Sequence, residues 1–170
     1  MSTPIKSLIA AVVLLLTATN CQKDFLDRKP PNKLTFEEFF KTAEHAEQAT
    51  NAVYEQFRNF DCIALPYLAC TDVLSDDADK GSTPNDAPLM SDLDNFTMDP
   101  SNTFIAPVYK GYYRAIARAN LAIENIPLVD MDAGKRDRLV GECKFLRAYS
   151  YYLLVQWFGD LPVITEPLSA

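Results

Sequence analysis

The sequence predicts an all-α protein built from antiparallel helix pairs. Three long segments repeat apolar residues at steps of three and four, which is the period of an amphipathic helix. The last two of these segments are similar in length, and only a short acidic turn at residues 130–132 separates them. Two such helices form an antiparallel hairpin, and hairpins of this size are the unit of helical repeat arrays.

Residues 1–20 are predicted to be a signal peptide. Lys6 supplies the positive start, and small or polar residues follow the apolar run 8–16. This run of nine residues cannot cross a hydrocarbon core, which needs about 20 residues in helical form. The segment therefore indicates secretion and not a membrane span.

Cys21 follows this leader directly, and its position predicts cleavage before it and acylation of its thiol. The protein would then be anchored to a membrane by lipid. An ordinary secretory peptide is the alternative, because Asn20 stands where a lipobox normally carries glycine, alanine or serine. Residues 21–34 are predicted to form a tether that includes the stiff Pro30-Pro31 pair.

A first helix is predicted to begin at Thr35, with Glu38 completing a capping box. It would run for about 25 residues. Its apolar face is made of residues at three- and four-residue steps: Phe36, Phe39, Phe40, Ala43, Ala46, Ala49, Val53, Phe57 and Phe60.

Residues 62–74 predict a weaker second helix, with Pro66 near its first turn, where proline is tolerated. Residues 75–100 are rich in Asp, Asn, Ser and Pro, and they carry the breakers Gly81 and Pro84. They predict a long loop. Loops of this length are uncommon unless they are functional or disordered.

The third helix is predicted over residues 104–126, where Pro127 stops it. A fourth helix follows the acidic turn and ends at Gly159, the expected C-cap. Its inward residues are predicted to be Leu139, Cys143, Leu146, Leu153 and Trp157. Residues 160–165 then leave the helix as an extended strip. Helices with such long apolar faces also predict that a large apolar patch stays exposed.

The net charge and the spacing of the cysteines argue against nucleic-acid binding and against zinc or redox sites. The net charge of −7 and the isoelectric point near 4.7 argue against nucleic acid, which needs clustered Lys and Arg. Cys62, Cys70 and Cys143 contain no Cys-x-x-Cys pair of the kind that zinc or redox sites use. They are predicted to be small buried apolar residues, with a bridge from Cys143 as the lesser alternative.

Segment 141–163 reads Gly-Glu-Cys-Lys-Phe-Leu-Arg-Ala-Tyr, then an aromatic and aliphatic helix, then Phe-Gly-Asp-Leu-Pro. It resembles the signature segment of the SusD/RagB family, with Cys143 in place of the family's alanine. Cys21 with residues 24–27 and Pro30 resembles the family's mature N-terminus. Residues 112–125 resemble its Tyr-x-x-Ile-x-x-Ala-Asn helix. Family members are several hundred residues long, so residues 35–170 resemble the N-terminal part of an incomplete SusD-like domain.

The resemblance implies a surface-exposed, lipid-anchored outer-membrane protein of the Bacteroidetes type, built on tetratricopeptide-like helix pairs. Such a protein covers a SusC-like TonB-dependent transporter and captures glycans or similar nutrients for import. The family binds and does not catalyse, and the resemblance implies no cofactor. A periplasm-facing lipoprotein that scaffolds envelope assembly is the rival function, because helical repeats also form concave peptide-binding surfaces.

Glycan capture needs aromatic rings that stack on sugar faces and polar groups that bind hydroxyls. The candidates next to the long loop are Tyr67, Asn95, Phe96 and Tyr109. Trp157 has the spacing of a core residue and is expected inside. His45 has no motif that would mark a catalytic base, and it is expected at the surface.

The acidic stretch around residues 72–79 offers a possible calcium site through Asp72, Asp76, Asp77 and Asp79, since calcium takes oxygen ligands. The stretch lacks the ligand spacing of an EF-hand, and a solvated loop is the preferred interpretation.

Overall fold

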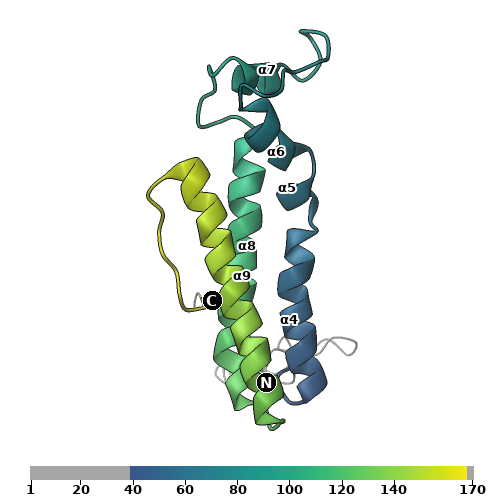
Figure 1. Cartoon of the computed structure of the whole chain (residues 1–170), viewed down its shortest axis with the longest axis vertical. Coiled ribbons are helices and arrows are strands. Elements are labelled where there is room, and N and C mark those ends of the chain that lie inside the picture. The colour runs from purple at the N-terminus through teal and green to yellow at the C-terminus, as the bar shows by residue number, and fades with distance from the viewer. Residues whose placement is uncertain (1–38, 168–170) are drawn as a thin grey trace, which may run out of the picture. The chain divides into compact units, whose positions relative to one another are not determined.

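The computed structural model describes residues 39–167, and within that range it is entirely helices and turns. Its body consists of three long helices, α4 (Ala43–Phe57), α8 (Ile105–Asn125) and α9 (Ala133–Phe158) (Figure 1). Helices α8 and α9 form the predicted antiparallel hairpin, and α4 packs against both. The all-α prediction is confirmed. No helix in this range is long and apolar enough to cross a bilayer.

Helix α4 begins later than predicted. Thr42 is its N-cap and accepts a hydrogen bond from the His45 amide at 3.3 Å, because a Thr hydroxyl competes for a free amide at this point. Phe40 lies in the turn before this cap, so the prediction of one helix from Thr35 to Phe60 is wrong. Thr35 itself lies outside the described residues, as do the signal peptide and Cys21.

The second predicted helix is three short pieces, namely α5 (Phe60–Ile63), α6 (Leu65–Leu68) and a π-helical turn at Ala69–Val73. Ala64 departs from helical geometry between the first two pieces, and Pro66 lies in the first turn of α6, where its missing amide costs nothing. The predicted loop at 75–100 also contains a helix, α7 (Pro88–Asp94), whose Met90 and Leu93 pack on Ala69.

Most of the long-helix core is built from small side chains. Alanines of α4 and α8 pack against α9, which lets the three helices approach closely: Ala46, Ala49, Ala119, Ala122, Leu139, Cys143 and Leu146 form one buried cluster. Cys62, Cys70 and Cys143 are free and buried, as predicted. In α9 the fully buried leucine near the C-terminus is Leu154, whereas Leu153 and Trp157 are only half-buried.

Helix α9 ends at Gly159, whose positive φ of 67° suits glycine and confirms the predicted C-cap. The strip that follows, residues 160–167, has no regular secondary structure and runs back beside the α8–α9 pair (Figure 1). Side chains of both helices hold it by its main chain. Tyr113 donates to the Pro162 carbonyl at 2.9 Å, and Tyr151 both donates to the Ile164 carbonyl and accepts from its amide.

We call the polar side chains that hold this strip the clamp. At its centre lie Asn120 of α8 and Arg147 of α9. Arg147 donates to Asn120 Oδ1 at 2.8 Å and to the Thr165 carbonyl at 3.0 Å. Asn120 is buried and donates through Nδ2 to the Ile164 and Glu166 carbonyls at 2.9 and 3.2 Å. The strip is therefore held mainly by polar groups that contact its main chain.

Candidate functional site

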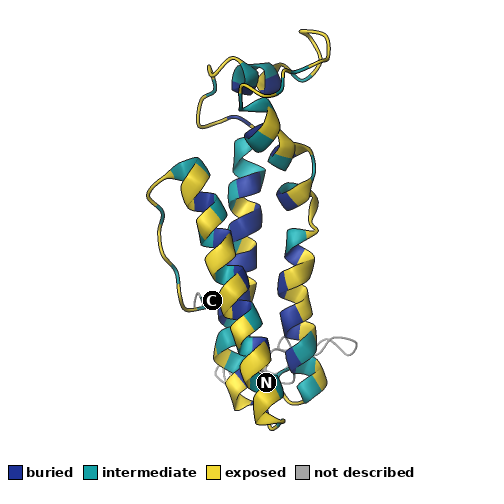
Figure 2. Cartoon of the chain, viewed as in Figure 1, coloured by how far each residue is buried: buried dark blue, intermediate teal, exposed yellow. Residues whose placement is uncertain are grey.

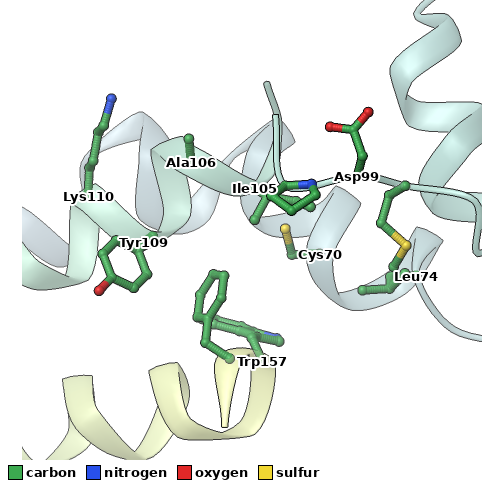
Figure 3. A pocket seen from close by; sticks show the side chains of 11 residues that line it. Cys70, Leu74, Asp99, Ile105, Ala106, Tyr109, Lys110 and Trp157 are labelled. Atoms are coloured by element: carbon green, nitrogen blue, oxygen red, sulfur yellow. The ribbon is translucent and has the colours of Figure 1, made fainter. Parts of the chain in front are cut away.

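The candidate site is a pocket at one end of the α8–α9 pair, with a volume of about 520 Å³ (Figure 3). Three parts of the chain meet there: the first turns of α8, the last turn of α9, and the turn after α6 with residues 98–100. The lining residues are Cys70, Leu74, Met98, Asp99, Pro100, Ile105, Ala106, Tyr109, Lys110, Trp157 and Phe158. The pocket is thus mostly apolar, with two charged side chains.

Aromatic contacts fix the position of Trp157. Its ring meets Tyr67 edge to face at 5.7 Å and lies tilted against Tyr112 at 5.6 Å. Phe158, which also lines the pocket, meets Tyr109 edge to face at 5.1 Å. Figure 3 shows Trp157 rising from α9 toward Ile105 and Tyr109 on α8. Because these contacts hold the ring in place, the part of Trp157 that lines the pocket can meet a ligand without reorganising.

Tyr112 and Cys70 form the buried base of this region. Burial raises the pKa of the Tyr112 phenol, whose hydroxyl donates to the Cys62 carbonyl at 3.2 Å. Burial also raises the pKa of the Cys70 thiol to about 11. Both groups are therefore neutral at physiological pH and behave as packing residues.

Asn102 positions the wall made by residues 98–100. Its buried side chain donates to the Leu89 carbonyl at 2.7 Å and accepts from the Phe104 amide at 3.0 Å, which ties α7 to the start of α8. Next to it, the side-chain hydrogen bond from Ser101, followed by its backbone amide, holds the pKa of Asp99 below its usual value. The pocket therefore carries an ionised carboxylate. The Lys110 ammonium is directed away from Trp157 (Figure 3).

The structure brings together only part of the predicted candidate set. Tyr109 lines the pocket, and Tyr67 packs against its Trp157 wall. Asn95 and Phe96 lie at the end of α7 and are not among the lining residues. The side chain of Asn95 donates through Nδ2 to the Ser91 carbonyl at 2.7 Å, and Phe96 is exposed with a positive φ of 55°.

Trp157 is expected in the core, and the structure shows it half-buried against the cluster of Tyr112, Ile116 and Leu154 while part of it also lines the pocket. Its helical spacing matches that of the buried residues of α9, and its place in the last turn of the helix brings part of it to the pocket. Met98, Asp99 and Pro100 were missed for a different reason, since they belong to the segment predicted as a loop. Their place beside α8 depends on Asn102, which no pattern in the sequence marked.

The acidic residues are not arranged as a metal site. Within residues 39–167, no group of three or more His, Cys, Asp or Glu side chains could hold a metal ion. Ser75 organises the turn, donating to the Asp72 carbonyl at 2.7 Å and accepting from the Asp77 amide at 3.2 Å. Calcium binding by Asp76, Asp77 and Asp79 stays a prediction without a preformed geometry. His45 is half-buried and stacks on Phe39 at 5.1 Å.

Comparison with known proteins identifies the family. The SusD-like model described as "Starch-binding associating with outer membrane" matches residues 24–169. The chain belongs to the SusD-like family. This confirms the resemblance drawn from the signature segment, and the structure gives two of the motifs a physical role: Arg147 and Tyr151 of the signature, with Tyr113 and Asn120 of the upstream motif, clamp the strip.

Relatives of this SusD-like chain are found among curated proteins and solved structures. SusD-like protein P2 of Formosa agariphila is 32% identical over 165 residues, and SusD-like protein P25 of the same organism is 25% identical over 173 residues. These matches cover 95% and 96% of this chain but only 31% and 32% of the relatives. A solved "Laminarin binding SusD-like protein" matches with a TM-score of 0.66 and 30% identity, over 76% of this chain and 28% of the other. The chain therefore spans about a third of its relatives' length.

Proposed function

We propose that this SusD-like chain takes part in glycan capture at the outer membrane, with the pocket around Trp157 as the contact surface for sugar rings. The observation that carries the proposal is the match to a laminarin-binding SusD-like protein at a TM-score of 0.66, together with a family model described as starch-binding and outer-membrane-associated. The function is binding and not catalysis, in keeping with the family.

The chemistry of the pocket supports this proposal. A pyranose ring has an apolar face of C–H groups and a rim of hydroxyls, so it needs a flat aromatic surface next to polar acceptors. Trp157 and Tyr109 supply aromatic surface on opposite helices, and the Asp99 carboxylate supplies an acceptor on the third wall. The pKa of Asp99 is lowered by Ser101, so the acceptor is charged at neutral pH.

The proposal includes an anchor and a partner. Acylation of Cys21 would hold the protein at the outer membrane, and residues 21–34 would give it reach toward a SusC-like TonB-dependent transporter. An affinity-tagged chain is then expected to co-purify with a barrel protein from solubilised outer membranes, and external protease is expected to remove it from intact cells. Protection from protease on intact cells, with other surface proteins degraded, would favour the periplasmic scaffold instead.

Calorimetric titration with laminarin and with starch oligosaccharides tests the pocket. Binding of one of them is expected, and Trp157→Ala should weaken it about tenfold or more, which corresponds to about 1.4 kcal/mol for one lost aromatic contact. Phe145→Ala is the matched control: it removes an exposed ring from the same helix about 18 Å away along the axis. Equal losses in the two variants, or a loss in Phe96→Ala alone, would contradict the assignment to this pocket.

A further inference from the structure

The negative charge of the chain is concentrated in one segment, residues 60–104, which we call the acidic segment. It contains nine Asp and one Lys, with no Glu, Arg or His, so its net charge is −8. The whole chain carries −7, so the other 125 residues sum to +1. The charge is therefore distributed very unevenly along the chain.

The acidic segment folds at one end of the helical body. It forms α5, α6, the π-helical turn and α7, and Figure 1 shows these helices gathered near the start of α8. Figure 2 shows the stretches that connect them as largely exposed. Six of the nine aspartates are exposed residues: Asp72, Asp76, Asp77, Asp79, Asp86 and Asp99. Their charges face the solvent at this end of the molecule.

The pocket around Trp157 is built partly from the acidic segment. Five of its eleven lining residues belong to that segment, and one of the five is Asp99. Asp72 lies near enough to act on Tyr67, which packs on Trp157: burial is the main cause that raises the Tyr67 pKa, and the charge of Asp72 acts in the same direction. The aromatic wall of the pocket therefore lies within reach of these carboxylates.

Cations offset little of this charge. Within residues 39–167, one ion pair neutralises a carboxylate of the acidic segment, namely Arg114 with Asp61 at 3.0 Å. Lys110 lines the pocket, but its ammonium is directed away from Trp157 (Figure 3). Five Lys and Arg side chains lie in the first half of α9, residues 133–147, which Figure 1 shows at the opposite end of the body.

We propose that the acidic segment makes the pocket selective for uncharged glycans over anionic ones, such as those that bear uronate or sulfate groups. The inference rests on the proposed function, since it names the class of glycan that the same pocket takes. A cleft with apolar walls and one sign of charge concentrates the electric field, and surface potentials reach several kT. At a potential of one kT, a monovalent anion is depleted about threefold, and each further charge on the same glycan multiplies this depletion.

Collisional quenching of Trp157 measures the potential at the pocket without any glycan. Trp157 is the only tryptophan, iodide is an anionic quencher, and acrylamide is an uncharged one. The Debye length falls from about 30 Å at 0.01 M ionic strength to about 3 Å at 1 M. The ratio of iodide to acrylamide quenching, normalised to a free tryptophan derivative, should be about threefold lower at the lower ionic strength. An equal ratio at both would overturn the proposal.

Two charge variants test whether the acidic segment is the source of the potential. The first removes three exposed charges on either side of Leu74, a residue of the pocket wall: Asp72→Asn, Asp76→Asn and Asp77→Asn. The matched control removes three exposed charges near the other end of the α8–α9 pair: Glu124→Gln, Asp130→Asn and Asp137→Asn.

The two variants are compared at about 0.1 M ionic strength, where the Debye length is about 10 Å. Helix α8 is about 30 Å long, so the distant control charges are screened from the pocket. The first variant should raise the iodide ratio, and the control should leave it unchanged. Equal shifts in the two variants would overturn the proposal.

Calorimetric titration separates the selectivity from the proposed function. A laminarin oligosaccharide is compared with a derivative that bears two or more sulfate groups. At about 0.1 M ionic strength the derivative should bind about tenfold or more weakly, and the difference should narrow at 1 M and in the first charge variant. Equal binding of the two, with iodide repelled, would overturn the selectivity. Repulsion of iodide without binding of either oligosaccharide would uphold the exclusion of anions and contradict glycan capture.

Discussion

The polar clamp on the strip predicts a specific loss of stability in Arg147→Ala. The substitution removes two hydrogen bonds from a charged donor, to Asn120 Oδ1 and to the Thr165 carbonyl. Water can replace the donor at Thr165, which is an exposed contact, but Asn120 is buried and its Oδ1 would lose its partner. Hydrogen bonds to charged groups are worth about 1.5–3 kcal/mol, so the expected cost is about 2 kcal/mol.

Urea unfolding followed by far-UV circular dichroism measures this cost. With a slope of about 1–3 kcal/mol per molar urea, a loss of 2 kcal/mol lowers the midpoint by about 1 M. Arg138→Ala is the matched control, because it removes the same side chain from an exposed pair with Glu142 on the same helix. That control should cost about 0.5 kcal/mol or less.

Hydrogen exchange shows whether the loss is local to the strip. The Ile164 amide donates to Tyr151, so in Arg147→Ala its exchange should accelerate more than that of amides in the middle of α8. If Arg147→Ala and Arg138→Ala have the same midpoint, and the Ile164 amide exchanges equally fast in both, the clamp does not hold the strip.

Three further predictions test other parts of the fold. Gly159→Ala should cost about 1 kcal/mol or more in urea unfolding, because its φ of 67° is unfavourable for alanine although no atom lies within 4 Å of the added Cβ; an unchanged midpoint would contradict this. Gly111→Ala places a Cβ 2.8 Å from Cys62 Sγ and should cost about 1–3 kcal/mol, and a double-mutant cycle with Cys62→Ala should recover part of it; strict additivity would exclude this clash as the cause. Burial raises the Cys70 pKa from 9.0 to about 11, so between these pH values the unfolded chain binds fewer protons than the folded chain. The contribution of Cys70 to stability should therefore be fully present below pH 9 and be lost as the pH rises toward 11, by roughly 1.4 kcal/mol per pH unit. Cys70→Ala should lose correspondingly less stability between pH 9 and 11 than the unsubstituted chain.

The sequence predicts α8 and α9 well because each ends at a strong local signal. Pro127 and Gly159 act as stops wherever the tertiary packing places them. The start of α4 is less predictable, because Thr35 and Thr42 both have the side chain of an N-cap and only the second is seen as one in the described residues. Helices α5, α6 and α7 have seven residues or fewer. Helices this short do not repeat apolar residues often enough for a helical period to be recognised in the sequence.

The candidate site was only partly visible in the sequence because it joins segments that are far apart. Tyr67 and Tyr109 were predicted from their position beside the long loop, and both lie at or behind the pocket wall. Trp157 has the spacing of a core residue and packs against the core, and its contact with the pocket follows from its place in the last turn of α9. Arg147 and Tyr151 are the opposite case. They belong to a motif that is plain in the sequence, but their role in holding the strip appears only in the structure.

The fluorescence of Trp157 offers the most direct test of glycan capture at the pocket, because it is the only tryptophan in the chain. A glycan that stacks on this ring should change its emission in a saturable way and should protect it from acrylamide quenching, with the same midpoint as the calorimetric titration. A laminarin or starch oligosaccharide that binds by calorimetry while the emission and quenching of Trp157 stay unchanged would place the binding surface elsewhere and contradict the assignment.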